Sequence, residues 1–174
     1  PGFKFYKAGR DKLPWDTETA LALLRESAAL GFVTAEYLLG KTYLQGKYVP
    51  QDIPEAVRWL TNAAQKDNQY AAFKLGKLYQ DGRYILPDLG QAEHWLTVAA
   101  QLGSPYGQYA LGKLYLDGPL YRPGAALALF HQAAEQDNTH AQLKLGRLYL
   151  TGAITSKNVP LAMSYLQQAA NKDN

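Results

Sequence analysis

The feature that most constrains the fold is a short run of residues that recurs four times at nearly constant spacing. Each run consists of leucine, glycine, a lysine or arginine, one variable residue and tyrosine, and the glycines are Gly40, Gly76, Gly112 and Gly146. Successive copies are therefore 36, 36 and 34 residues apart. A second glycine follows each tyrosine by three residues: Gly46, Gly82, Gly118 and Gly152. Self-similarity at such a period indicates stacked supersecondary units.

A second motif keeps the same register and divides each unit into two helices. It is a pair of small residues: Ser27-Ala28, Ala63-Ala64, Ala99-Ala100, Ala133-Ala134 and Ala169-Ala170. We predict that the first helices of the units, here called A helices, cover about 33–45, 69–81, 105–117 and 139–151. The second helices, here called B helices, cover about 17–30, 53–66, 89–102, 124–136 and 159–172. The predicted fold is an all-α, right-handed α-solenoid of helix–turn–helix repeats.

Residues at the predicted helix ends support these boundaries. The second glycine of each run is a natural C-terminal stop for an A helix. Four polar residues occupy the N-cap positions of B helices, where a side-chain oxygen can accept from free backbone N–H groups: Asp16, Asp52, Asp88 and Asn158. Pro54 and Pro160 follow in the first turn, which tolerates proline. In the third unit Arg122 takes the cap position after a loop two residues shorter, so we expect a frayed or shifted helix start there.

The small residues predict close helix packing. Glycine in the middle of a helix costs about 1 kcal/mol relative to alanine, so the glycine of each run needs an offsetting contact. Close approach of a neighbouring helix would supply it, and the alanine pairs would act in the same way on the B helices. Larger side chains on the B helices are expected to fill the remaining core: Trp59, Leu60, Trp95, Leu96, Phe130 and Leu166.

These motifs resemble the Sel1-like repeat family, which is related to the tetratricopeptide repeats. The resemblance rests on the Leu-Gly-Lys-Leu-Tyr-x-x-Gly runs and on lines such as Glu55-Ala56-Val57-Arg58-Trp59-Leu60, and it covers about residues 16–174. It divides the chain into a partial repeat at about 1–31 and repeats at about 33–67, 69–103, 105–137 and 139–173. Tyr6-x-x-Gly9 looks like the tail of a truncated A helix. We therefore expect the chain to be a window from a longer array or a larger protein.

The A helices should carry a polar stripe opposite their packed side. At about 100° per residue, the leucine before the run's glycine, the tyrosine three after it and the alanine five before it share one side. The resemblance implies that the opposite side lines a concave groove. The candidate partner-binding residues on that side are Lys41, Tyr70, Lys77, Asp81, Tyr106, Lys113, Asp117, His140 and Arg147. Thr34, Gln45 and Thr151 share it, while Tyr37, Phe73, Tyr109 and Leu143 flank it and are expected to contact the next repeat. In the alternative interpretation the stripe is a solvated face, with Lys77–Asp81 and Lys113–Asp117 as weak i,i+4 pairs.

The sequence offers little for catalysis, metals or cofactors. It has no cysteine, which removes disulfides, thiolate zinc sites and cysteine nucleophiles. Its histidines, His94, His131 and His140, lie in three different predicted helices without metal-ligand spacing. Gly40-Lys41-Thr42 lacks the earlier glycine of a phosphate-binding loop, because Ala35 stands in that position. We predict no enzymatic activity, no metal and no cofactor.

The resemblance favours a non-catalytic scaffold or adaptor whose groove binds a peptide or partner domain, and the cations suit an acidic one. A first alternative is an accessory region of a larger bacterial enzyme such as a plasmid-mobilisation relaxase. A second is nucleic-acid binding through the basic and aromatic groove, although a net charge of +3 does not require such a partner. No apolar run approaches the roughly 20 residues that span a bilayer. The lack of cysteine fits the cytosol and the periplasm equally well.

Overall fold

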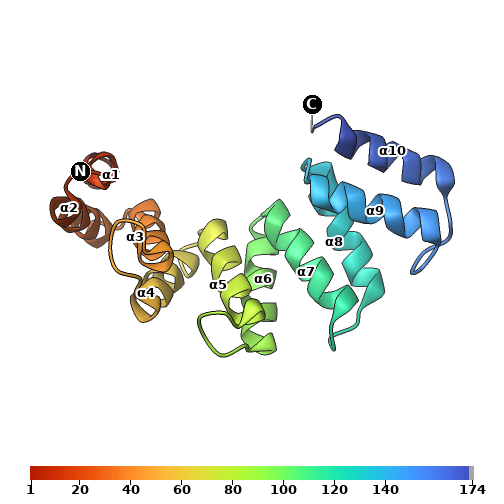
Figure 1. Cartoon of the computed structure of the whole chain (residues 1–174), viewed down its shortest axis with the longest axis horizontal. Helices are drawn as coiled ribbons and strands as arrows, with labels where there is room; N and C mark the ends of the chain where they lie inside the picture. Colours follow the sequence, from red (N-terminus) through yellow and green to blue (C-terminus); the bar gives the residue numbers. More distant parts are fainter. Residues whose placement is uncertain (173–174) are drawn as a thin grey trace. The chain divides into compact units, whose positions relative to one another are not determined.

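The computed structural model describes residues 1–172, which form ten α-helices and no strand (Figure 1). The A helices are α1 (Gly2–Lys12), α3 (Val33–Gln45), α5 (Gln69–Asp81), α7 (Pro105–Asp117) and α9 (Thr139–Thr151). The B helices are α2 (Thr17–Ala29), α4 (Ile53–Ala64), α6 (Leu89–Gln101), α8 (Pro123–Glu135) and α10 (Val159–Ala170). The four predicted A helices agree residue for residue, and each predicted B helix starts within one residue of the observed one. The all-α helical-repeat fold is thus confirmed.

The helices form two compact units, Pro1–Trp95 and a second that begins at Leu96. In the first unit α1 packs on α2, α2 on α3, α3 on α4 and α4 on α5. In the second, α7 packs on α8, α8 on α9 and α9 on α10. The boundary falls inside α6. Within each unit, successive helices therefore contact their sequence neighbours, as expected for a repeat fold.

The glycines in the middle of the A helices lie against large side chains of the B helices. A β-carbon on Gly40 would lie 2.7 Å from Leu60 Cγ and 3.0 Å from the Leu60 backbone nitrogen. One on Gly112 would lie 2.7 Å from Phe130 Cε1. Leu60 and Phe130 are fully buried. The predicted packing role of these glycines is confirmed, because any side chain would force the two helices of a hairpin apart.

The interpretation of Tyr6-x-x-Gly9 as the tail of a truncated helix is wrong. Gly9 lies inside helix α1, which continues to Lys12, and a β-carbon on Gly9 would lie 2.8 Å from Leu24 Cγ. It is therefore the equivalent of Gly40. The loop from α1 to α2 covers only residues 13–16, whereas the loop from α3 to α4 covers 46–52. The α1–α2 loop is three residues shorter, and α1 ends three residues after its glycine whereas α3 ends five after Gly40. Together these differences place Gly9 31 residues before Gly40 (40 − 9), out of the 36-residue register.

The predicted N-caps of the B helices are confirmed. Asp16 accepts a hydrogen bond from the Thr19 backbone N–H at 3.2 Å, and Asp52 accepts one from Glu55 at 3.0 Å. Asp88 and Asn158 cap α6 and α10 in the same way. These bonds satisfy backbone donors that have no partner within the helix.

The expected frayed or shifted helix start at Arg122 is wrong. Arg122 gives no side-chain cap, but α8 begins directly after it at Pro123, whose fixed φ suits the first helical turn. The Arg122 backbone N–H also donates to the Tyr115 carbonyl at 2.8 Å. Asp52 N–H donates to Tyr43 in the same way at 3.1 Å, so one backbone bond closes both hairpins. What the shorter loop changes is Gly118, which is extended (φ −122°), whereas Gly46 is left-handed (φ 64°).

We predict that Gly40→Ala lowers the free energy of unfolding by about 1–3 kcal/mol, because the added methyl group meets Leu60 inside a packed hairpin. This loss outweighs the better helix propensity of alanine. Urea unfolding followed by circular dichroism measures the change. Gly124→Ala in α8 is the matched control, since no atom lies within 4 Å of a β-carbon there. The control should be neutral or stabilising by up to about 1 kcal/mol, and an equal gain from Gly40→Ala would contradict the packing role.

We further predict that Arg122→Asp raises the free energy of unfolding by roughly 0.5–1 kcal/mol. The new carboxylate would cap α8 and complement the positive end of the helix. Thermal melting compares this variant with Asp52→Ala, which removes an existing cap and should cost about 1 kcal/mol. A loss on Arg122→Asp alongside a loss on Asp52→Ala would show that α8 does not start as described.

Candidate functional site

The structure places the predicted stripe residues on the surface of the A helices. Tyr70 and Tyr106 are 51% and 54% exposed. Asp81, Lys113, Asp117, His140 and Arg147 are also exposed, while Lys41 and Lys77 are partly covered. The opposite side is packed, as Ala35 and Leu39 show with no exposed surface. We call the nine candidate residues the A-helix stripe. Four of them lie in the first unit (Lys41, Tyr70, Lys77, Asp81) and five in the second (Tyr106, Lys113, Asp117, His140, Arg147).

Aromatic rings connect successive A helices within each unit. The Tyr37 ring of α3 lies 6.0 Å from the Tyr70 ring of α5, centre to centre. The Tyr109 ring of α7 stacks on the His140 ring of α9 at 5.6 Å. The predicted contact of the flanking aromatics with the next repeat is confirmed for these two pairs. Burial raises the pKa of the Tyr37 phenol above its ordinary value, and the neighbouring Tyr70 adds to the shift. Tyr37 is therefore a neutral hydrogen-bond donor at physiological pH.

Only one of the two ion pairs predicted along the stripe is present. Lys77 Nζ lies 2.8 Å from Asp81 Oδ1 on the same helix. Asp117 instead lies 3.6 Å from Lys144 Nζ of the next A helix, so the predicted Lys113–Asp117 pair is wrong. Asp117 ends α7, where its carboxylate can reach α9 as readily as one turn back along its own helix. In both observed pairs the aspartate is exposed and the lysine partly covered, and each pair contributes at most about 1 kcal/mol.

Three cations of the stripe are left without an ion pair within residues 1–172. They are Lys41, Lys113 and Arg147. An exposed cation has no need of a partner in the same molecule, because water solvates it. Such a cation can nevertheless pair with an incoming carboxylate without first breaking an internal bond.

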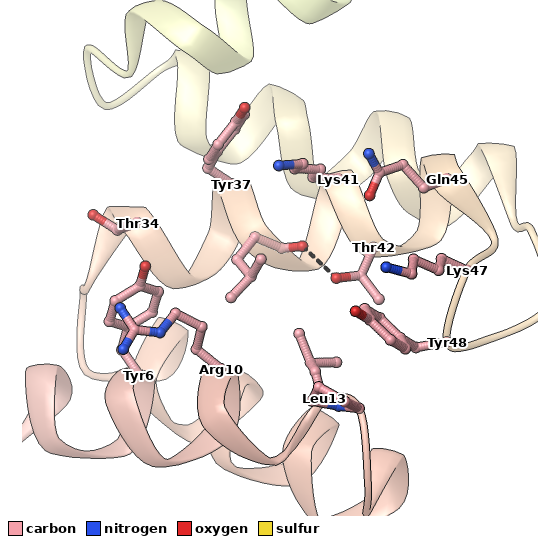
Figure 2. Close-up of a pocket in the computed structure, with 12 residues that line it drawn as sticks. Tyr6, Arg10, Leu13, Thr34, Tyr37, Lys41, Thr42, Gln45, Lys47 and Tyr48 are labelled. Carbon is pink, nitrogen blue, oxygen red and sulfur yellow. Dashed lines mark hydrogen bonds between the residues drawn. The ribbon is translucent and has the colours of Figure 1, made fainter.

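The first unit contains a cavity of about 560 Å³ beside α1 and α3, shown in Figure 2. Lys41 lines it together with Thr34, Tyr37 and Gln45 of the same helix face. The sequence analysis missed the other polar lining residues: Tyr6 and Arg10 of α1, and Lys47 and Tyr48 of the loop after α3. We call this the α1–α3 pocket.

Two signals in the sequence could have identified the missed residues. Alignment of Gly9 with Gly40 puts Arg10 at the position of Lys41. Lys47-Tyr48 follows the closing glycine of its repeat just as Arg83-Tyr84 follows Gly82. In both pairs the cation lies over the tyrosine ring, at 4.9 Å for Lys47 and 5.1 Å for Arg83. These cation–π contacts hold the positive charge at the end of the A helix.

The α1–α3 pocket is basic. Arg10, Lys41 and Lys47 line it, and no aspartate or glutamate of the described chain does so. Arg10 is bound to Asp11 at 2.8 Å, which neutralises part of its charge. Two smaller hollows have a similar character. One of about 190 Å³ is lined by Lys74, Lys77, Asp81, Arg83 and Tyr84, together with two leucines. The other, of about 240 Å³, is lined by Tyr109, His140, Leu143, Lys144 and Arg147.

The histidines outside the stripe have structural surroundings. The two ring nitrogens of His131 lie 3.0 Å from the Tyr165 hydroxyl and 2.9 Å from the Tyr149 hydroxyl. His94 is exposed beside the ring of Trp95. Within residues 1–172 no three histidine, aspartate or glutamate side chains are grouped as metal ligands. None of the described helices has the length and apolar character needed to cross a membrane.

The sequence matches the family model of the Sel1 repeat five times, over residues 2–32, 33–68, 69–104, 105–138 and 139–174. The first match covers α1 as part of a repeat. No curated protein matches the chain.

Solved structures of repeat proteins are similar to this chain along its length. The protein c5321, a protective antigen of uropathogenic Escherichia coli strains with an SLR fold, is 27% identical, with a TM-score of 0.92. The match covers all of this chain but only 39% of the E. coli protein. A Sel1 repeat protein from Oxalobacter formigenes is 23% identical, with a TM-score of 0.88, and is covered over 74% of its length by the whole of this chain. Immunity protein Pa5087 from Pseudomonas aeruginosa is 22% identical, with a TM-score of 0.61, over 97% of this chain and 64% of that protein.

We predict that the Tyr37 phenol titrates above the ordinary tyrosine pKa and that Tyr70→Ala moves its pKa back toward that value. Removal of the Tyr70 ring would let water reach Tyr37 and stabilise the charged phenolate. Ring-carbon NMR shifts followed through an alkaline titration measure both values. Tyr106→Ala, in the other unit, serves as the control and should leave Tyr37 unchanged. An unchanged Tyr37 pKa in Tyr70→Ala would rule out the ring contact as a cause of its burial.

Proposed function

Because the chain belongs to the Sel1 repeat family, we propose that it is a non-catalytic scaffold that binds a peptide or partner domain on its A-helix stripe. Proteins of this family are commonly protein-interaction scaffolds and typically bind proteins. The position of the partner on the A-helix stripe is inferred from the exposed side chains of this chain.

The observation that carries the proposal is that, within each unit, the outward face of the A helices carries cations without an internal ion pair beside exposed aromatic rings. Lys41, Lys113 and Arg147 have no internal ion pair among residues 1–172, and Tyr70 is half exposed although its ring contacts Tyr37. Tyrosine gives a large contact area at a small entropic cost, and arginine is enriched among the residues that dominate binding. A face used only for solubility would not need half-exposed tyrosines held in place by their neighbours.

Nucleic-acid binding through the same face is less well supported. Proteins that bind single strands stack bases on free aromatic faces. Here Tyr37 packs on Tyr70, and Tyr109 stacks on His140, so each ring already has an aromatic neighbour. Asp81 and Asp117 also bring negative charge to the stripe beside Lys77 and Lys144.

The test is a triple charge reversal, Lys77→Glu with Lys113→Glu and Arg147→Glu. Wild-type protein is used to select from phage-displayed random 12-residue peptides, and the enriched peptides are then offered to the variant. We expect the variant to lose at least about 90% of the captured phage, because each reversal turns an attraction for the peptide into a repulsion. Its circular dichroism spectrum should stay unchanged. Its free energy of unfolding should fall by no more than about 1 kcal/mol, because only Lys77 gives up an ion pair, with Asp81.

A control variant carries the same change in charge elsewhere: Lys4→Glu, Lys7→Glu and Lys157→Glu. These lysines are exposed and lie outside the stripe. Retained capture by the stripe variant, or equal loss in both variants, would show that the stripe is not the binding surface.

A further inference from the structure

We infer that the α1–α3 pocket binds carboxylates and anchors an acidic segment of the partner protein. This inference rests on the proposed scaffold function and adds to it a location and a class of ligand. Family membership assigns neither, because the pocket depends on Arg10, Lys47 and Tyr48, which belong to this sequence.

The lining of the pocket is positively charged. Three cations from three segments line one cavity: Arg10 from α1, Lys41 from α3 and Lys47 from the loop that follows α3. Only Arg10 has an acidic neighbour, Asp11, which is exposed and about half accessible to solvent. Figure 2 shows the Lys47 ammonium group directed toward the interior, near Thr42 and Tyr48. Mutual repulsion among these cations favours an incoming anion, whose binding relieves it.

The pocket also offers hydrogen-bond donors. Tyr6, Tyr37 and Tyr48 line the cavity with Lys41. Figure 2 shows the Tyr37 hydroxyl directed away from Arg10 and Leu13. Tyr6 and Tyr48 are therefore the tyrosines whose hydroxyl groups can donate to a carboxylate oxygen in the pocket. Thr42 cannot serve as a donor, because its hydroxyl already donates to the Leu38 carbonyl at 2.8 Å (Figure 2). Charge-assisted bonds of this kind are about twice as strong as bonds between neutral groups.

The aromatic contacts in the pocket favour a carboxylate over the bases of a nucleic acid. The tyrosine rings of the pocket already have neighbours. Tyr6 lies 5.1 Å from Phe32, Tyr37 lies 6.0 Å from Tyr70, and Lys47 covers Tyr48 at 4.9 Å. A base would need one of these ring faces for stacking. The hydroxyl groups and ammonium groups need no ring face and can bind a compact carboxylate.

The pocket has the size of a ligand site and lies next to the rest of the stripe in the first unit. About 560 Å³ lies within the range of roughly 300–1,000 Å³ found for ligand pockets. On the α5 side, Tyr37 contacts Tyr70 on the same helix as Lys77, the next cation of the stripe. A peptide that places one acidic side chain in the pocket can therefore continue along the stripe toward α5.

The test uses defined peptides and the whole chain. Acetyl-tetraglutamate amide is titrated into ¹⁵N-labelled protein, with acetyl-tetraglutamine amide as the neutral probe. We expect the acidic peptide alone to shift the backbone signals of residues 10, 41 and 47. Lys41→Glu with Lys47→Glu should weaken binding at least about tenfold. Lys41→Arg with Lys47→Arg should retain it, because the charge is kept.

Lys4→Glu with Lys7→Glu is the charge-matched control and should bind like the wild type. Equal weakening in this control would reveal general attraction rather than a pocket and would overturn the assignment. Absence of shifts with the acidic peptide, or tighter binding of an octathymidylate, would overturn it as well. The phage selection reports on the scaffold separately. If it enriches neutral peptides that the stripe variant fails to capture, the scaffold proposal stands while the pocket assignment fails.

Discussion

The contact between a glycine of the A helix and a large side chain of the B helix governs the architecture of the hairpins α1–α2, α3–α4, α7–α8 and α9–α10. At Gly40 and Leu60 a methyl group would lie within 2.7 Å of the opposing side chain, and at Gly112 and Phe130 the clearance is the same. Such contacts set the distance between the two helices of a hairpin. Because the glycine commits one side of the A helix to packing, the residue after it is turned away from the core. The cations of the stripe owe their position to this geometry.

The sequence was sufficient to predict most of the fold, because the forces that set it are local and repeated. Asp52 and Asn158 indicate where their helices begin, because their side chains can cap the first backbone N–H groups. The closing glycine indicates where the A helix ends. The second helix of the first repeat was predicted, but its first helix was misinterpreted for an equally physical reason. The loop after it has only four residues, and α1 ends three residues after Gly9, so Gly9 fell outside a comparison based on constant spacing. The prediction of a frayed start at Arg122 failed because a backbone hydrogen bond and Pro123 define the start of α8 even without a side-chain cap.

The candidate site was predictable only as far as it follows from helix geometry. The exposed positions of Lys113 and Arg147 follow from the 100° advance per residue, and so does the burial of Leu39. Helix geometry does not predict which cation pairs with an exposed carboxylate, since Asp117 pairs with Lys144 on another helix. A pocket is harder still, because it joins side chains from separate segments. Arg10 and Lys47 are 37 residues apart (47 − 10) and meet only when α1 packs beside α3.

In four of the five hairpins among the described residues, a backbone bond runs from the N–H of the N-cap residue to the carbonyl of the tyrosine in the repeated run. It is present with the five-residue loop before Arg122 and with the seven-residue loops before Asp52, Asp88 and Asn158. In the α1–α2 hairpin, whose loop has four residues, the Asp16 N–H donates to the Lys12 carbonyl instead. The same closing bond therefore accommodates loops of two lengths, and the loop after α3 carries Lys47 and Tyr48. In such an array ligand preference can diversify through its connections while the helices stay constant, much as grafted loops change the target of an engineered binder.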